Sequence, residues 1–493
     1  MVNKEIPTTK EIRNKNTKNI YLPDAIKFTS VSLADVFNNK LRLEANAFNL
    51  DAKVAKEKVL KNKYGVVKLW SENGLVGEAY HRPRFKRIYV DQKEIPFFQP
   101  SSITEVYPKP ARYISSKTDT NLEDLKVKKG MLLMTVSGTI GKVAIAGKKL
   151  DNQIFSHDLL RLVGKNKYDT GYIYSYFLTQ TGQSILQSNN YGAVIKHVEP
   201  EHLKDLIIPN APEKIKKEIH DFVTQSYNYR DQSNDLIDRA EQILYSELKI
   251  KDLDLLKIEY FDDSIEVRNY TTKLSNLKLR LDGSFHVPKS KAILKHLDKH
   301  AKEVVGIKDD RMSDKVIHPN RFKRVYSNAE NGVPFFGGAN LLNLVPSSGK
   351  YLALSQHEKI INNDLRIKEN TIIVTRSGTI GKVVLCPKHW DNWIASDDLL
   401  RVYPKSKKVA GYIQCWLNSE IGNSLLKRNV YGSVVDHIEV KHIEETEIPI
   451  LKNQEMQQEI NDLVLESNKF RYKAFLKEQN AINRMEEIIN ETK

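Results

Sequence analysis

Cysteine is nearly absent from this chain, since Cys386 and Cys415 are the only two among 493 residues. Two thiols are too few for a disulfide framework or for a zinc site built on cysteines. Long apolar runs are also missing, because no stretch approaches the ~18 uninterrupted apolar residues of a membrane-spanning helix. The opening residues, MVNKEIPTTKEIRNK, hold no apolar segment of a secretory signal. We therefore expect a cytoplasmic protein with no membrane contact.

Acidic residues are outnumbered by basic ones. The 62 Asp and Glu stand against 77 Lys and Arg, which leaves a formal net charge of +15. A hydrophobic content of 40% favours a folded chain over a disordered one, and the length suits about three domains of ~150 residues each. An excess of cations favours nucleic acid as a partner, because binding releases counterions from the phosphates. On charge alone, a solvated basic surface is an equal alternative.

The chain is an internal repeat. SGTIGKV at 137–143 returns unchanged at 377–383, an offset of 240 residues. The same offset joins SHDLLRL at 156 to SDDLLRV at 396, GYIYSYFLTQTG at 171 to GYIQCWLNSEIG at 411, and YGAVIKHVE at 191 to YGSVVDHIE at 431. Further upstream, RFKRIY at 84 matches RFKRVY at 321 with a small shift, which loop insertions explain. Solenoid units have only ~20 to 50 residues, so each copy should be a domain.

A segment without internal proline or glycine follows each copy. In the first, from 212 to about 248, apolar residues follow a four-three spacing that Ser226 and Ser233 interrupt: Ile215, Ile219, Phe222, Tyr229, Leu236, Ala240 and Ile243. The second, from about 453 to 490, opens with QEINDLV, an echo of KEIHDFV in the first. At ~1.5 Å per residue, each helix would span roughly 50 Å. We expect the helices to pack together as a spacer; packing of each on its own domain is the alternative.

Within each copy the pattern is mostly that of strands. Apolar, β-branched runs flank the Ser-Gly-Thr turn at 137 and at 377, which predicts two strands joined by a tight turn. LIIP at 206 and EIPI at 447 predict short strands that end at proline. The segments 171–186 and 411–426 place aromatics and leucine at helical spacing and predict one helix over the sheet. Each copy should be an α+β domain.

Motifs of catalysis do not fit this chain. SGTIGKV has two residues between its glycines where a P-loop has four, and Val143 replaces the Mg²⁺-binding hydroxyl. IPFF at 95 and VPFF at 333 lack the polar residue and second proline of a base methyltransferase. His197 and His437 fit a structural polar role better than metal ligation. We expect no catalytic residue, metal site or cofactor in this chain.

A basic cluster with a central phenylalanine occurs twice, as HRPRFKR at 81–87 and HPNRFKR at 318–324. In an extended segment, Arg84 and Lys86 would share one face while Phe85 turns into the core. Such cations can follow a phosphate backbone, although a solvated strand anchored by Phe85 is the alternative. With the turn residues, we predict DNA contacts from Arg82, Arg84, Lys86, Arg87, Ser137, Thr139, Lys142 and Lys196, and from Arg321, Lys323, Arg324, Arg376, Ser377, Thr379 and Lys382.

Otherwise matched blocks differ at a few positions. The replacements from first to second copy are Val136 by Arg376, Gln153 by Trp393, Phe155 by Ala395, His157 by Asp397 and Lys196 by Asp436. Two readers of different base sequences would differ in this way, because Arg, Gln, Asp and Asn prefer different base edges. Drift after duplication would also produce such differences.

The order of these blocks resembles the DNA-specificity (S) subunit of type I restriction-modification systems. The likeness is carried by RLEA and RLDG at Arg42 and Arg280, by the blocks that end in SGTIGKV, by SHDLLRL and SDDLLRV, and by YGAVIKHVEPEHLKDLIIP and YGSVVDHIEVKHIEETEIPI before each long helix. It covers nearly the whole chain after about residue 25. The polar leader, 1–21, has no counterpart in the second copy.

The resemblance implies an α+β chain with two similar target recognition domains, alternating with two long helices that pair as an antiparallel coiled coil. It places the leader and first domain at 1–211, a central helix at 212–250, the second domain at 251–451 and a C-terminal helix at 452–493. Each domain would read half of a split target in double-stranded DNA.

The implied partners are two modification subunits, which supply methyl transfer, and restriction or motor subunits. S-adenosylmethionine, Mg²⁺ and ATP would be bound by those partners, with none in this chain. Specificity subunits of type IIB-like systems look alike at this level. A self-contained DNA-modifying enzyme with an unrecognised site is the third interpretation.

Overall fold

The structure is a computed structural model that describes residues 30–38, 41, 45–90, 94–188, 197–250, 271–277, 280–346, 349–432 and 434–492. The leader at 1–21, Arg42 of the RLEA block and the predicted DNA contact Lys196 lie outside these residues.

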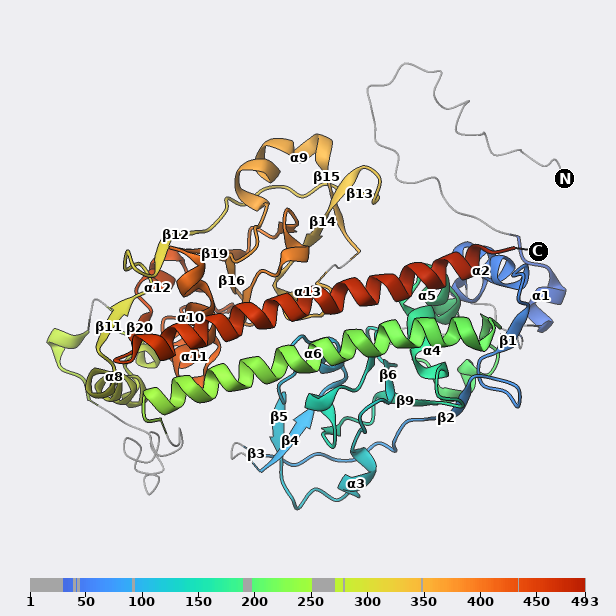
Figure 1. Cartoon of the computed structure of the whole chain (residues 1–493), viewed down its shortest axis with the longest axis horizontal. Coiled ribbons are helices and arrows are strands. Elements are labelled where there is room, and N and C mark those ends of the chain that lie inside the picture. Colours follow the sequence, from blue (N-terminus) through green and yellow to red (C-terminus); the bar gives the residue numbers. More distant parts are fainter. Residues whose placement is uncertain are drawn as a thin grey trace.

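Two long helices form the axis of the molecule. α6 (Glu213–Glu247) and α13 (Gln454–Asn490) lie side by side, with one domain on each side of the pair in the view of Figure 1. They run antiparallel, because Ser226 lies against Ala474 while Ser233, further along α6, lies against Ser467, further back along α13. The predicted antiparallel pair is confirmed, and 35 and 37 residues at ~1.5 Å each give helices of roughly 50 to 55 Å.

The seam between the helices contains Ser226 and Ser233, the two polar residues that occupy seam positions of the four-three spacing. The Ser226 hydroxyl donates to the Ala474 carbonyl at 2.8 Å, and the Ser233 and Ser467 hydroxyls are 2.8 Å apart. All three serines are buried. Small side chains let the two backbones approach closely, and their hydroxyls find partners on the facing helix.

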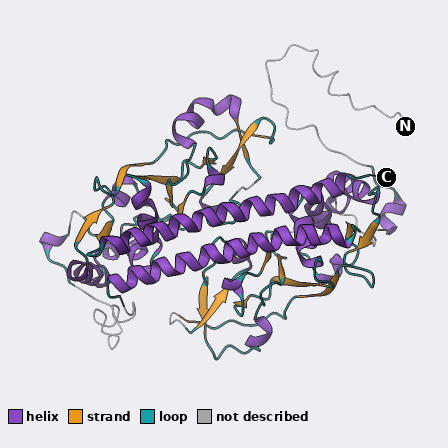
Figure 2. Ribbon diagram, viewed as in Figure 1, coloured by secondary structure: helices purple, strands orange, loops and turns teal. Residues whose placement is uncertain are grey.

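Each domain contains the same three sheets. In the first, they have the strand orders β2-β9-β6-β7, β3-β5-β4-β8 and β1-β10. In the second, the matching orders are β12-β19-β16-β17, β13-β15-β14-β18 and β11-β20. Figure 2 shows these strands on both sides of the helix pair. Because every pairing recurs, the predicted duplication of an α+β domain is confirmed at the level of topology.

The strands are short. Those of the first domain are β1 (Val66–Lys68), β2 (Val76–Tyr80), β3 (Tyr89–Val90), β4 (Ile95–Phe98), β5 (Arg112–Ile114), β6 (Leu132–Thr135), β7 (Val143–Ile145), β8 (Ile154–Phe155), β9 (Leu159–Gly164) and β10 (Ile207–Pro209). Those of the second are β11 (Glu303–Gly306), β12 (Ser313–Ile317), β13 (Tyr326–Ser327), β14 (Gly332–Phe336), β15 (Tyr351–Ala353), β16 (Ile372–Thr375), β17 (Val383–Leu385), β18 (Ile394–Ala395), β19 (Leu399–Pro404) and β20 (Glu447–Ile450).

Shorter helices flank the sheets. The first domain has α1 (Leu33–Asn38), α2 (Leu50–Leu60), α3 (Leu122–Leu125), α4 (Asp169–Leu178) and α5 (Gln180–Ser188). The second has α8 (Pro288–His300), α9 (Leu354–Ile360), α10 (Lys407–Asn418), α11 (Glu420–Lys427) and α12 (Val440–Glu444). Over the described residues, none of the helices is both long and apolar enough to span a membrane.

The repeated SGTIGKV block forms the predicted strand-turn-strand unit in both domains. β6 pairs antiparallel with β7, and β16 with β17. Gly138 and Gly141 have φ angles of 67° and 83°, a left-handed conformation that glycine adopts without steric cost. The turn therefore needs both glycines, and it needs them for geometry rather than for binding phosphate.

The predicted single helix over each sheet is in fact two helices. Thr179 and Ser419 adopt extended backbone conformations and separate α4 from α5 and α10 from α11. Each hydroxyl accepts a hydrogen bond at 3.1 Å from the backbone N–H of Gly182 or Gly422, so it caps the following helix. The glycine is required, since a Cβ at Gly182 would lie 2.2 Å from the Tyr176 carbonyl oxygen.

Each long helix belongs to both domains. Ile219 and Val223 of α6 lie in the core of the first domain, whereas Ala240 and Leu244 lie in the core of the second. α13 does the reverse: Ile460 and Val464 pack in the second core, and Ala481, Met485 and Ile488 pack in the first. Packing of each helix on its own domain alone is therefore excluded, and the pair binds the two domains into one unit.

The two domains also touch each other directly. The backbone N–H of Val106 donates to the Leu342 carbonyl at 2.7 Å, and that of Leu344 donates to the Thr104 carbonyl at 2.7 Å. Glu105 and Asn343 form the antiparallel bridge between these bonds. The helices are therefore not the sole element that fixes the distance between the domains.

Candidate nucleic-acid interface

The basic clusters run along the domain surface as extended chain without regular strand pairing. Arg84 and Lys86 are exposed, whereas Phe85 is half-buried with its ring edge against Phe97 at a centroid distance of 6.3 Å. In the second domain, Arg321 and Lys323 are exposed, and Phe322 packs on the core around Phe335. Phenylalanine thus anchors each segment and leaves two cations in solvent.

The last arginine of each cluster turns inward. Arg87 Nη2 donates to Ser156 Oγ at 3.0 Å and lies 3.0 Å from His157 Nδ1. Arg324 Nη2 pairs with Asp397 Oδ1 at 2.5 Å and donates to Ser396 Oγ at 3.3 Å. Both arginines have polar partners within the chain, so each connects the basic segment to the serine of the block at 156 or 396.

Arg82 is also engaged within the protein. Its Nε donates to the Asp124 carbonyl at 2.5 Å, and its guanidinium lies over the Tyr80 ring, 4.6 Å from the centroid. In contrast, none of the described carboxylates lies within 4 Å of Arg84, Lys86, Arg321 or Lys323, although Arg82 and Arg324 each have an ion pair. Within the two basic clusters, the exposed cations without a carboxylate partner among the described residues are therefore Arg84 and Lys86, and Arg321 and Lys323.

The Ser-Gly-Thr turns lie beside these arginines. Ser137 Oγ donates to Asp158 Oδ1 at 3.2 Å, and Ser377 Oγ donates to Asp398. Thr139 and Thr379 are exposed at the tips of the turns. The serines are therefore structural, and the threonines are the turn residues that face solvent.

The serine-aspartate blocks, SHD at 156–158 and SDD at 396–398, join the basic cluster to the turn. Sequence reasoning used them for the repeat but did not propose Ser156, Asp158, Ser396 or Asp398 as site residues. Their signal was available in the sequence, since each block has a serine and, two residues later, an aspartate directly before a buried strand. Their partners, about 20 residues away in the turn and 70 in the basic cluster, become neighbours only in the fold.

A buried arginine supports each of these blocks. Arg161 donates to the carbonyls of Leu159 and Leu125 at 3.0 and 2.9 Å. Arg401 donates to the carbonyls of Ser396 and Ala395 at 2.9 and 2.7 Å. Burial lowers the pKa of Arg161 to about 10, which leaves it charged at neutral pH. These guanidiniums hold the loop backbone that carries the cluster.

Two of the replaced positions meet in this cluster. Arg376, where the first domain has Val136, is 9% exposed and lies 3.5 Å from Asp398 Oδ1 and 3.4 Å from Glu439 Oε1. Asp397, where the first domain has His157, pairs with Arg324. The second domain therefore has one more cation and one more anion at these positions, each with its own partner, and Arg376 as placed is an internal partner of two carboxylates.

The histidine of the first cluster is held neutral by its surroundings. Burial lowers the pKa of His157, and the neighbouring Arg87 and Arg84 lower it further against the opposing effect of Asp158. A neutral imidazole can both donate and accept hydrogen bonds, unlike the carboxylate of Asp397. The two clusters thus differ in hydrogen-bonding character as well as in charge.

Lys142 and Lys382 are half-buried after the turn. Lys382 lines a cavity where the two domains meet. Burial raises the pKa of Glu105 in the same cavity, and the positive charge of Lys382 partly opposes this shift. Its predicted contact with DNA stays a prediction, and the described geometry gives it an internal neighbour. Within the described ranges, no group of three or more His, Cys, Asp or Glu residues could hold a metal ion.

One protein-family model matches this sequence, and it matches it twice. The sequence model described as the type I restriction modification DNA specificity domain matches residues 71–242 and 314–465, one match in each half of the chain. No curated protein sequence matches the chain.

Solved structures of low sequence identity align with most of the chain. The S subunit of a type I restriction-modification system from M. genitalium has 12% identity and a TM-score of 0.30, over 86% of this chain and 98% of that one. The HsdS subunit from Thermoanaerobacter tengcongensis has 10% identity and a TM-score of 0.27, over 87% and 99%. A chain from a study of type I system assembly has 10% identity and a TM-score of 0.26, over 84% and 97%.

Proposed function

Because this chain belongs to the type I restriction-modification DNA specificity family, we propose that it reads a DNA target in two parts, one in each domain. The observation that carries this proposal is the duplicated cluster. Both domains present two solvent-exposed cations beside a Ser-Gly-Thr turn, on the same topology, while the residues behind them differ.

Within each domain, the exposure and pairing of the side chains indicate which of them contact phosphates. Arg84 and Lys86, with Arg321 and Lys323, contact phosphates and fix the register, because they are exposed and unpaired among the described residues. Phosphate contacts carry no sequence information, so base choice must come from groups other than these cations. Thr139 and Thr379, at the exposed turn tips, are the same residue in both domains and can contact DNA without distinguishing the two halves of the target.

The antiparallel helices set how the two parts of the target are arranged. Equivalent contacts on both sides of the pair, Ser226 with Ala474 and Ser233 with Ser467, relate the domains by an approximate two-fold axis. The domains then approach DNA in opposite orientations. A separation on the scale of the ~50 Å helices corresponds to roughly one and a half turns of B-DNA.

The chemistry is assigned to partners. We propose that the chain itself catalyses no reaction and that it docks two modification subunits and, through them, restriction or motor subunits. S-adenosylmethionine, Mg²⁺ and ATP belong to those partners under this proposal. The limits 1–211 and 251–451 are proposed for the two reading domains, with the long helices as spacers.

Methylome sequencing tests this function. Cells that carry the complete system should methylate a split motif, and exchange of residues 71–211 for those of another specificity subunit should change one half of that motif. Exchange of 314–451 should change the other half. A motif that changes in both halves, or in neither, contradicts the proposal. Robust methylation of DNA by the purified chain alone, with S-adenosylmethionine and Mg²⁺, would favour a self-contained enzyme instead.

A further inference from the structure

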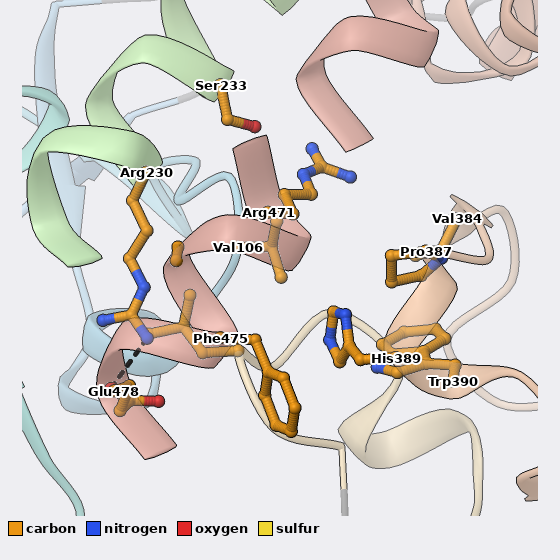
Figure 3. Close-up of a pocket in the computed structure, with 12 residues that line it drawn as sticks. Val106, Arg230, Ser233, Val384, Pro387, His389, Trp390, Arg471, Phe475 and Glu478 are labelled. Carbon is orange, nitrogen blue, oxygen red and sulfur yellow. Dashed lines mark hydrogen bonds and ion pairs between the residues drawn. The ribbon is translucent and has the colours of Figure 1, made fainter. Parts of the chain in front are cut away.

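The helix pair places one arginine from each helix near its centre, and the two have different surroundings. KEIHDFV at 217 and QEINDLV at 458 align α6 with α13, so Arg230 and Arg471 occupy equivalent positions. Figure 3 shows Arg230 reaching Glu478, while the guanidinium of Arg471 points away from that pair. Of these two equivalent arginines, Arg230 has a carboxylate partner and Arg471 has none among the described residues.

In the first half, the arginine has a complete set of partners. Arg230 Nη2 lies 2.7 Å from Glu478 Oε1, and the Tyr174 hydroxyl donates to the same carboxylate. The Tyr227 hydroxyl lies 3.3 Å from that of Tyr174. Burial alone would lower the pKa of Arg230, but the carboxylate raises it above its ordinary value. The charge is thus neutralised inside the protein.

In the second half, these partners are missing. Ile237 occupies the position equivalent to Glu478, and Gln414 the position equivalent to Tyr174. None of the described carboxylates lies within 4 Å of Arg471, whose hydrogen bond goes to Asn468 Oδ1 at 3.3 Å. Arg471 Nε and Gln414 Oε1 are buried without hydrogen-bond partners among the described residues, and Gln414 is 5% exposed. Burial lowers the pKa of Arg471 to about 10.

A cavity of about 560 Å³ lies beside Arg471. It lies between residues 105–109 of the first domain and α10 and α11 of the second, and both Arg471 and Gln414 line it. Its size falls in the range of roughly 300 to 1,000 Å³ typical of small-molecule sites.

Cations dominate the lining. Lys109, Lys289, Lys382, Lys427 and Arg471 face three carboxylates, those of Glu105, Glu241 and Glu420. Burial raises the pKa of Glu105. Burial, and to a smaller extent the charge of Lys109, lower the pKa of Lys427. Buried charge without a counter-ion is unfavourable, so an anion that enters the cavity gains the pairing that Glu478 gives Arg230.

We propose that this cavity binds a small organic anion, with its phosphate or carboxylate group paired to Arg471 and its body against Ile237 and Val384. Lys382 and Lys427 supply further positive charge. The proposal does not rest on the reading of DNA, and Lys382 is the one lining residue that is also a predicted DNA contact. Occupancy would join the first domain to the second at a point beside their direct contact, and so would stabilise the whole chain.

Calorimetric titration of the full chain with inorganic phosphate, citrate and adenosine monophosphate tests the proposal. We expect saturable binding of at least one probe with one site per chain, and a rise in the unfolding temperature with its concentration. Equal affinity for phosphate and adenosine monophosphate would mean that the anion alone is recognised. Tighter binding of adenosine monophosphate than of phosphate would mean that the organic body of the ligand also contributes to affinity. Either result supports the site.

Two variants locate the binding. Arg471→Met removes the guanidinium, and Ile237→Glu supplies the carboxylate that the other half already has. Each should weaken binding at least about tenfold, the effect of one lost charged contact. Ile237→Glu should still fold, because it copies the Arg230 arrangement, and this keeps the test valid if Arg471→Met unfolds. Lys214→Ala, a charge removed from the exposed start of α6, is the matched control and should bind normally.

Absence of saturable binding for all three probes would overturn the proposal, and would leave the cavity to water or to a segment of a partner protein. Unchanged affinity in both Arg471→Met and Ile237→Glu would also overturn it, because the anions would then bind elsewhere on the basic surface.

Discussion

At the scale of single residues, exposure and pairing separate the cations into two groups. Arg87, Arg324 and Arg376 each have polar partners within the chain and brace the recognition cluster. Arg84 and Lys86 stay in solvent, as do Arg321 and Lys323. The basic clusters look uniform in sequence, yet only two cations of each are exposed and without a carboxylate partner among the described residues.

Replacement of Arg84 and Lys86 by alanine should weaken DNA binding on every sequence. The plot of log K against log salt has a negative slope of ~0.9 per phosphate contact, so the loss of two contacts should reduce the steepness of this slope by about two. Binding measured at several salt concentrations, on specific and unrelated duplexes, checks this. Lys53→Ala with Lys214→Ala removes the same charge from exposed positions elsewhere and should leave the slope intact. Loss of specificity with unchanged binding to unrelated DNA would contradict the assignment.

At the scale of elements, the long helices join by polar contacts as well as by apolar packing. The seam has serines at its centre, and beside them lies the ion pair of Arg230 with Glu478, whose side chains are only 10% and 4% exposed. The periodicity of apolar residues predicted the pairing of α6 and α13. It did not predict the serines as contacts, because their role depends on which carbonyl or hydroxyl faces them across the pair.

Removal of Glu478 should therefore cost much more stability than removal of an exposed partner. Glu478→Ala leaves Arg230 buried without a counter-ion and should lower the free energy of unfolding by about 3 to 5 kcal/mol. Glu459→Ala breaks the more exposed pair with Arg239 on the same two helices and should cost at most about 1 kcal/mol. Denaturant unfolding of both variants makes the comparison. Equal losses would show that burial of the Arg230 pair does not matter.

At the scale of the whole molecule, two features fix the distance between the domains. One is the helix pair, whose ends are built into both cores. The other is the direct contact of residues 104–106 with 342–344. A spacer made of helices alone could be lengthened freely, whereas this arrangement resists any change that separates the two segments.

Insertion of one heptad into both helices near their centre should add about 10 Å, at ~1.5 Å per residue. The recognised halves of the target should then lie about three base pairs further apart, at 3.4 Å per pair. Methylome sequencing of the complete system reads that spacing. The inserted protein should also unfold more easily, because the Val106–Leu342 and Leu344–Thr104 hydrogen bonds must break. Unchanged spacing would mean that the helices do not act as the ruler.

The sequence by itself determined the duplication, the two long helices and the strand-turn-strand units. Each depends on local propensity or on letters that recur at one offset, and both can be read from the order of residues without knowing which of them meet in space. The breaks at Thr179 and Ser419 were also local, in a hydroxyl three residues before a glycine, and were missed because the apolar spacing continues across them.

Only the tertiary structure decided which charges are paired, which cations remain free and where the domains meet. Arg87 finds Ser156 about 70 positions away, and Arg230 finds Glu478 about 250 positions away. Arg471 has no carboxylate partner among the described residues, where Ile237 and Gln414, on two other helices, replace the Glu478 and Tyr174 of the first half. Electrostatic pairing depends on distance in space and on exclusion of water, and neither is set by the order of residues along the chain.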